Sequence, residues 1–301
     1  MNMNKKLLAL GLSLTMVLGL AACGGDSSSS TSGSSSNTDA STSQADASTS
    51  TGDTSTSAEV TTGTAGKLIL GTSADYPPFE FHILDENGED QIVGLDVALG
   101  RQIAEDMGLE FEVIHMDFDN LFQLLNQGRC DMVIAAMEYN EERGENGGYS
   151  DGYYSDIPPK IIVKAGTEDQ YTSLEDFDGK VVGAQMATTK ADIVTNDMPG
   201  ATPSFMSSVI DLMNNLVYDK CDALVLDGAV ADEYLESNPD LAAVDIDMSG
   251  YVEPYRVWVA KDDPNNLLPS INETIAKVLE DGSMDAFIAE AQEQSAQALE
   301  G

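Results

Sequence analysis

Several side chains near the ends of predicted strands and helices suit a small molecule that carries both a carboxylate and an ammonium group. Arg143 offers a planar guanidinium, whose two-point geometry fits a carboxylate. Thr188 stands at the start of a predicted helix, where free N–H donors and the positive end of the helix dipole attract anions. Asp227 follows a predicted strand and can pair with an ammonium. Tyr76 and Phe118 can then cover the apolar part of such a ligand.

Each of these residues also has an ordinary structural explanation. Arg143 lies within the acidic stretch 141–145, so a solvent-exposed ion pair is an alternative role for it. Asp227 alternatively caps the helix that follows it, and the two aromatic residues alternatively pack in the core. Thr188 suits a helix N-cap whether or not it also contacts a ligand, because the two roles use the same geometry.

The composition excludes one class of partner and gives no support to metal chemistry. The chain has 301 residues, and 14 Lys plus Arg against 52 Asp plus Glu give a net charge of −38 at pH 7. Nucleic acid is excluded because its phosphates need clustered cations. His82 and His115 do not stand at metal-ligand spacing with cysteines, so we expect neither a metal nor another cofactor.

Residues 1–22 read as an export signal. Two lysines precede an apolar stretch that is shorter than the roughly 20 residues needed to span a bilayer. Residues 20–23, Leu-Ala-Ala-Cys, are similar to the lipobox of bacterial lipoproteins. This similarity implies cleavage before Cys23 and a lipid on Cys23, which would hold the protein on the extracytoplasmic face of the cell membrane. A signal-anchor with an incidental cysteine is the alternative.

Residues 23–65 form a Ser/Thr-rich segment without aromatic or cationic side chains. Such a segment cannot bury enough apolar surface to offset the entropy of ordering, so we expect a disordered tether. Its root-mean-square reach is on the order of 35 Å.

From residue 67 onward, short apolar runs alternate with stretches of helical spacing. Leu95, Leu99, Ile103 and Met107 recur every four residues, which places them on one helical face. We expect strands at 67–70, 111–114, 132–135, 160–163, 181–184, 202–205, 223–226 and 256–260, and helices at 121–125, after 188, and at 209–217, 266–280 and 283–298. This alternation predicts an α/β fold with parallel strands and crossover helices.

Two segments, 118–137 and 209–228, share an outline of a helix, a Cys-Asp pair and an apolar strand. They suggest two similar α/β units with Cys130 and Cys221 at equivalent places. We therefore expect packed, unbonded thiols rather than a disulfide, a redox site or a metal site.

Seven strings in order along the chain resemble the bacterial solute-binding proteins for polar amino acids, such as those for glutamine, histidine and lysine or arginine. The strings are residues 72–81, 93–97, 116–118, 137–143, 149–154, 182–189 and 222–227. Each string alone is weak evidence, but their common order and similar spacing are specific. The resemblance covers nearly all of the chain from residue 67 to the last predicted helix.

The resemblance implies a two-lobed, periplasmic-binding-protein-like fold of type II, in which two α/β domains are joined by two hinge strands. It predicts a larger lobe of residues 66–154 and 253–301 and a smaller lobe of residues 155–252. It further implies that the protein captures a free amino acid between the lobes and delivers it to the permease subunits of an ABC importer. On this interpretation the protein is not an enzyme.

The resemblance also implies roles for individual residues. Arg143 clamps the α-carboxylate of the ligand, together with backbone N–H groups and a Thr hydroxyl at the helix start. Asp227 binds the α-ammonium, and Phe118 faces Tyr76 across the ligand side chain. The predicted ligand-binding residues are Ser73, Tyr76, Phe118, Ala136, Glu138, Arg143, Gln185, Thr188, Thr189 and Asp227.

Three positions depart from the family pattern. Ala136 and Ala187 replace the usual glycines, and a methyl group there narrows the pocket or shifts the backbone. Glu138 replaces the usual Thr, which sets two carboxylates against Arg143 and favours a cationic amino acid over an acidic one. The alternative is that Glu138 turns outward.

Two other functions remain open on the sequence alone. One is an enzyme on the same fold, such as a cyclohexadienyl-type dehydratase or a lytic transglycosylase carrying this module. That chemistry needs a positioned acid or base, and Glu138 is the unusual carboxylate near the site. The other is a surface adhesin that uses the Ser/Thr segment as a stalk. Product formation and ligand-induced stabilisation separate these possibilities from a binding protein.

Overall fold

The computed structural model describes the backbone of residues 60–300 and the side chains of residues 60–296. The predicted signal peptide, the predicted lipidation site Cys23 and most of the predicted tether lie outside the described residues. Within the described part, no helix combines the length and the apolar character that crossing a bilayer requires.

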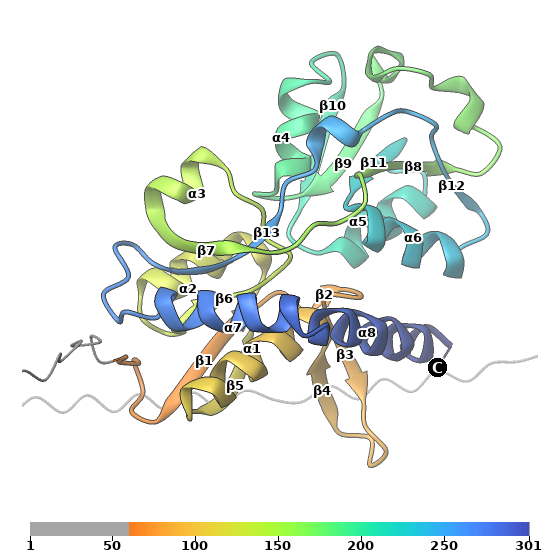
Figure 1. The fold of residues 1–301 in the computed structure, drawn as a ribbon. Coiled ribbons are helices and arrows are strands. Elements are labelled where there is room, and N and C mark those ends of the chain that lie inside the picture. The colour runs from red at the N-terminus through yellow and green to blue at the C-terminus, as the bar shows by residue number, and fades with distance from the viewer. Residues whose placement is uncertain (1–59, 301) are drawn as a thin grey trace, which may run out of the picture. The chain divides into compact units, whose positions relative to one another are not determined.

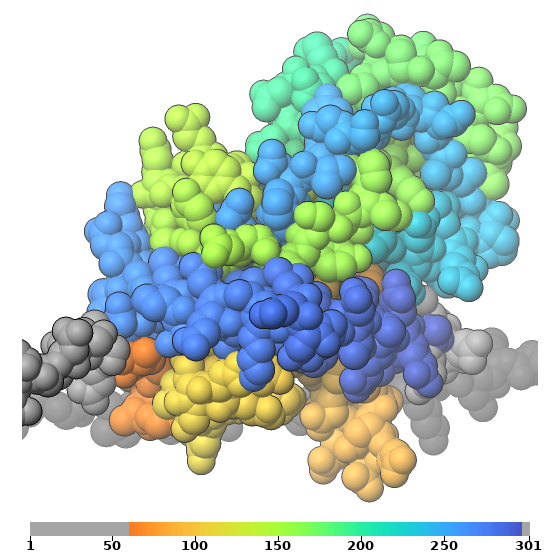
Figure 2. Space-filling model, in the orientation of Figure 1, coloured from red at the N-terminus to blue at the C-terminus, as the bar shows by residue number. Residues whose placement is uncertain are grey.

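The first sheet has five strands in the order β5-β1-β6-β13-β7 (Figure 1). They are β1 (Lys67–Thr72), β5 (Glu110–His115), β6 (Met132–Val133), β7 (Gly147–Tyr154) and β13 (Tyr255–Ala260). Its helices are α1 (Leu95–Met107), α2 (Leu121–Asn126), α3 (Glu141–Asn146), α7 (Leu268–Glu280) and α8 (Ser283–Glu300). Both α7 and α8 contact α1 and form the blue band across the face shown in Figure 2. The C-terminal helices therefore pack with the helices of the first sheet.

The four-residue spacing in α1 identifies its buried face. Leu95, Leu99 and Ile103 have no exposed surface and face the first sheet and its neighbouring helices. The helix ends at Gly108, whose left-handed φ of 69° suits a residue without a side chain. The predicted helix and its core-facing stripe are thus confirmed.

The second sheet has the order β10-β9-β11-β8-β12. Its strands are β8 (Lys160–Lys164), β9 (Val181–Gln185), β10 (Thr202–Met206), β11 (Ala223–Leu226) and β12 (Leu241–Ala243). Helices α4 (Thr189–Asn196), α5 (Val209–Val217) and α6 (Gly228–Ser237) connect them. The two sheets draw their strands from different sides of residues 155 and 252, which supports the two lobes as a proposal.

A third, small sheet follows the first strand. It consists of β2 (Asp75–Tyr76), β3 (Glu80–Leu84) and β4 (Asp90–Val93), all antiparallel. The sequence pattern did not predict this hairpin. It places Tyr76 directly beyond the carboxyl end of β1, which is where the two prolines at 77 and 78 were expected to hold it.

The expectation of parallel strands throughout is wrong for part of each large sheet. β1 runs parallel to β5 and β6, and β9 runs parallel to β10 and β11. In contrast, β13 is antiparallel to β6 and β7, and β8 is antiparallel to β11 and β12. Both β8 and β13 follow a passage of the chain from one sheet to the other. No crossover helix precedes them, so nothing fixes a parallel direction.

The end of the predicted tether contacts the folded part. Thr61 N–H donates to the Asn265 carbonyl at 3.1 Å, and Gly63 N–H donates to the Asp131 carboxylate at 2.7 Å. Residues 60–65 therefore differ from the disordered segment that their composition indicated.

The two cysteines of this part of the chain are free and buried, as predicted. Burial raises the pKa of the Cys130 thiol to about 12 and that of the Cys221 thiol to about 11. Both therefore stay protonated and pack as small apolar side chains.

Candidate ligand-binding site

One small cavity collects side chains that follow strands of both large sheets. Its volume is about 10 Å³, and its lining is Tyr76, Phe118, Ala135, Ala136, Glu138, Arg143, Thr188, Thr189, Lys190 and Asp227. Eight of the ten predicted ligand-binding residues are among them. The site thus lies beyond the carboxyl ends of β1, β6, β9 and β11, which is where α/β sheets bind ligands.

Asp227, which follows β11, points at Tyr76 of the small third sheet. The Tyr76 hydroxyl donates to Asp227 Oδ2 at 2.5 Å. Asp227 stands at the N-cap of α6 but makes no side-chain capping bond there. Its carboxylate is 5% exposed, so it serves the cavity and the capping alternative does not apply.

Lys190 lies in the same place. Its ammonium donates to Glu138 Oε2 at 2.7 Å, to Thr189 Oγ1 at 3.1 Å and to Asp227 Oδ1. Lys190 is 3% exposed and Glu138 is 4% exposed. The outward orientation considered for Glu138 is therefore not the one observed, and the two carboxylates share a lysine.

Arg143 is buried rather than part of a surface ion pair. Its guanidinium donates to the carbonyl of Glu138 at 2.6 Å and to the carbonyl of Ala187 at 2.7 Å. The guanidinium carbon lies 5.4 Å from the centre of the Phe118 ring. Burial lowers the pKa of Arg143 to about 10, so the side chain remains a cation at neutral pH. The positive charge of Arg143 therefore lies between the segment that follows β6 and the segment that follows β9.

The start of α4 has the expected cap. Thr188 Oγ1 accepts from Ala191 N–H at 3.2 Å and donates to the Gln185 carbonyl at 2.6 Å. Thr189 Oγ1 donates to Glu138 Oε2. The Thr188 hydroxyl thus fixes the first turn, and the positive end of the helix faces the cavity.

Both alanines that replace family glycines adopt left-handed backbone angles, with φ of 46° at Ala136 and 63° at Ala187. This conformation costs roughly 1–2 kcal/mol for a residue with a side chain. A buried aspartate holds the first of them, because Asp96 Oδ2 accepts from Ala136 N–H at 2.6 Å. The Tyr153 hydroxyl donates to the other oxygen of this carboxylate, Asp96 Oδ1, at 2.8 Å.

Two predicted ligand residues lie outside the lining of this cavity. Ser73 is buried and its hydroxyl lies 3.4 Å from Asp75 Oδ1. Gln185 donates to the Ser207 carbonyl at 2.9 Å. Their contact with a ligand stays a prediction.

The charges of Lys190, Glu138 and Asp227 shift the pKa values of Lys190 and Glu138. Burial alone lowers the pKa of Lys190, but Asp227 and Glu138 together raise it above 10.5. Burial raises the pKa of Glu138, with Lys190 opposing and Asp227 adding to the rise. Lys190 is therefore a fixed cation, and the site contains two cations and two carboxylates.

Sequence analysis missed Lys190. It directly follows the string 182–189, two residues after the predicted N-cap, and that position was the available signal. A cation in the first turn opposes the helix dipole, so its presence there indicates a partner that compensates.

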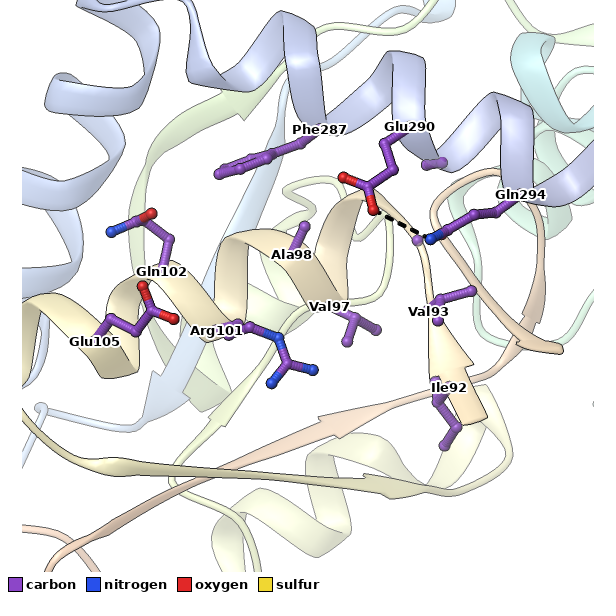
Figure 3. A pocket seen from close by; sticks show the side chains of 12 residues that line it. Ile92, Val93, Val97, Ala98, Arg101, Gln102, Glu105, Phe287, Glu290 and Gln294 are labelled. Carbon is purple, nitrogen blue, oxygen red and sulfur yellow. Dashed lines mark hydrogen bonds between the residues drawn. The ribbon is translucent and has the colours of Figure 1, made fainter. Parts of the chain in front are cut away.

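Two further cavities lie nearby or on the outer surface. One of about 300 Å³ shares Phe118 and Arg143 with the site and is also lined by Ala187, Asp119, Glu142 and Asp192. The other, of about 350 Å³, lies between α1, α8 and β4, away from these residues. Figure 3 shows Val97 and Arg101 on α1 and Phe287 and Glu290 on α8 among the side chains that line it.

This cavity brings the guanidinium of Arg143 together with the carboxylates of Glu138 and Asp227. Residues 68–291 match the bacterial extracellular solute-binding proteins, family 3. The chain therefore belongs to this family, and its fold is the type II periplasmic amino-acid-binding fold.

Particular relatives are named for the amino acids they bind. The chain is 30% identical over 239 residues to the arginine-binding extracellular protein ArtP of Bacillus subtilis, covering 79% of this chain and 78% of ArtP. Against the substrate-binding protein AbpA of Streptococcus pneumoniae bound to L-arginine, the TM-score is 0.72 at 31% identity, covering 76% of this chain and 96% of AbpA. An ancestral arginine-binding protein bound to arginine gives a TM-score of 0.67 at 35% identity, covering 75% and 97% of the two chains.

Proposed function

We propose that this protein is the substrate-binding component of an amino-acid ABC importer and hands its ligand to the permease subunits. The observation that supports this most strongly is the placement of Arg143 and Asp227 at one cavity, with elements of both sheets contributing to it. A guanidinium for a carboxylate and a carboxylate for an ammonium are the two contacts that an amino acid requires. Closure of two lobes about residues near 155 and 252 would complete the site.

A cationic amino acid is the ligand we propose. The relatives named above bind arginine, and they share about a third of their residues with this chain. The acid-lined cavity beside Arg143 offers Asp119, Glu142 and Asp192 to a positively charged side chain. The excess of carboxylates that the sequence suggested for the small cavity does not support this proposal, because Lys190 balances Glu138.

Titration of the full-length chain with L-arginine tests the function. Replacing Arg143 with Ala should weaken binding by roughly 2–5 kcal/mol, because the ligand carboxylate loses its buried partner. Isothermal titration calorimetry measures this, and Arg101→Ala, at the outer pocket of Figure 3, is the matched control. Equal affinity of Arg143→Ala and the unmodified chain would contradict the proposed site. Conversion of the amino acid to a product would favour an enzyme instead.

We also propose that the lipid on Cys23 holds the protein to the extracytoplasmic face of the membrane. The support is the lipobox-like string at residues 20–23 and the family's description as extracellular. Cys23→Ala should move the protein from the membrane to the soluble fraction, since a lipid chain supplies the hydrophobic attachment. Unchanged membrane association, measured by fractionation and lipid labelling, would overturn this proposal.

A further inference from the structure

The ammonium of Lys190 already occupies the position that an amino acid's ammonium would take. All three of its N–H donors have partners: Glu138, Thr189 and Asp227. Its chemical group, a primary ammonium, is the same as that of the ligand. The surrounding cavity of about 10 Å³ has room for roughly one water molecule.

Both oxygens of Asp227 already accept from donors of the protein. Oδ1 pairs with Lys190, and Oδ2 accepts from the Tyr76 hydroxyl. Glu138 Oε2 likewise accepts from both Lys190 and Thr189. Because the cavity of about 10 Å³ holds no more than about one water, a ligand ammonium can reach Asp227 only by taking a place that the Lys190 or Tyr76 side chain now holds. Of the Lys190 and Tyr76 side chains, only Lys190 is a cation, so a ligand ammonium that replaces it leaves the charge of the site unchanged.

We propose that Lys190 sets the affinity of the site by competing with the ligand's ammonium for Asp227 and Glu138. The inference rests on the proposed function and adds one step to it: the Lys190 side chain leaves the two carboxylates when the amino acid binds. Every amino acid that places its ammonium on Asp227 displaces the same group. Lys190 thus lowers the affinity for all of them by one common factor, as a minor binding-competent state does.

A different role for Lys190 predicts a different pattern. If Lys190 stayed on Glu138 beside the bound ligand, it would act as a permanent counter-charge. Its removal would then leave Glu138 without a partner when a neutral amino acid is bound, whereas a cationic ligand could replace the lost charge. Affinities for the two kinds of ligand would move apart instead of rising together.

The test compares Lys190→Gln with the unmodified full-length chain by isothermal titration calorimetry. Three probes separate the cases: L-arginine, L-glutamine and 5-guanidinopentanoate, which is arginine without its α-ammonium. We expect the affinities for both amino acids to rise by the same factor, about tenfold, and the affinity for the third probe to change less than twofold. Lys220→Gln, at an exposed lysine beyond α5, should change none of them.

A second variant guards against an effect on folding alone. Lys190→Gln combined with Glu138→Gln removes one charge of each sign. The affinities for both amino acids should again change by one common factor, and the gain should be smaller than in Lys190→Gln because the ligand ammonium then meets one carboxylate fewer. Loss of affinity for both amino acids in the two variants, or a gain for arginine with a loss for glutamine, would overturn the competition and leave the proposed function standing. Failure of the unmodified chain to bind any amino acid would overturn the proposed function and this inference together.

Discussion

Two pairs of buried carboxylates lie close to Ala136, and they differ in what neutralises them. Glu138 and Asp227 share the ammonium of Lys190. Glu80 and Asp96 have no ion-pair partner among the described residues, and neither oxygen of Glu80 has a hydrogen-bond partner there. Burial and then Asp96 hold the pKa of Glu80 well above 4.5, and burial raises the pKa of Asp96 to about 6.

This difference in the neutralising group indicates which pair of carboxylates a ligand can bind. An isolated buried carboxylate is costly, so each pair needs either a cation or a proton. Uptake of a proton by the Glu80 pair depends on pH, because the raised pKa values of Glu80 and Asp96 shift their titration upward. The cation on the Glu138 pair belongs to a side chain that can move, so a ligand's ammonium can replace it.

The largest expected effect on the free energy of unfolding comes from removing Lys190, the shared partner of Glu138 and Asp227. Lys190→Met leaves Glu138 and Asp227 buried together without a counter-charge. The free energy of unfolding at pH 7 should fall by about 3–5 kcal/mol, as when one partner of a buried ion pair is removed. Urea denaturation followed by circular dichroism measures this, and Lys220→Met should stay within about 0.5 kcal/mol of the unmodified chain.

A double variant is the control for this interpretation. Lys190→Met with Glu138→Met replaces a cation and an anion together and should recover most of the lost stability, because only Asp227 then needs a partner. Equal stability of the single and double variants would show that shape rather than charge causes the loss.

A smaller effect tests the pair that depends on a proton. An acid whose pKa is raised on folding binds more protons when folded, so its contribution to stability is present at low pH and is lost as pH rises through about 6. Lowering the pH from about 7 to about 5 should therefore raise the free energy of unfolding by about 1 kcal/mol through Asp96, with Glu80 adding in the same direction.

Asp96→Asn should flatten this rise, because an amide keeps an acceptor for the Ala136 N–H and does not titrate. Urea denaturation at the two pH values gives both slopes, and Asp211→Asn at an exposed position is the matched control. A pH dependence that Asp96→Asn leaves unchanged would remove this group from the explanation.

Elements with a strong local signal were predictable from the sequence. Helix α5 begins and ends as predicted, at Val209 and Val217, because Ser208 accepts from Asp211 N–H and the apolar spacing marks one face. The eight site residues that share the cavity were found through the family strings. Strand β6 was predicted as 132–135 but ends at Val133, since the chain then turns toward the left-handed Ala136.

Features that depend on the tertiary structure were not predictable in the same way. The direction of β8 and β13 follows from the passage of the chain between sheets, which apolar runs do not record. Lys190 was missed because its partners, Glu138 and Asp227, stand 52 and 37 positions away along the chain. The first-turn position of Lys190 indicates that some partner compensates its charge, but only the folded structure identifies Glu138 and Asp227 as that partner.

The contact of residues 60–65 with Asp131 has a mechanical consequence for an anchored molecule. Asp131 accepts from Gly63 N–H with one oxygen and from Ile69 N–H with the other, at the start of β1. If the proposed lipid on Cys23 holds the chain, tension from the membrane side would enter the fold here and pull along β1, whose hydrogen bonds to β5 run over its whole length. Bonds loaded along a strand share the force, and the cavity lies beyond the opposite end of that strand. Such a pull would therefore be shared among the hydrogen bonds between β1 and β5 before it reached the far end of β1.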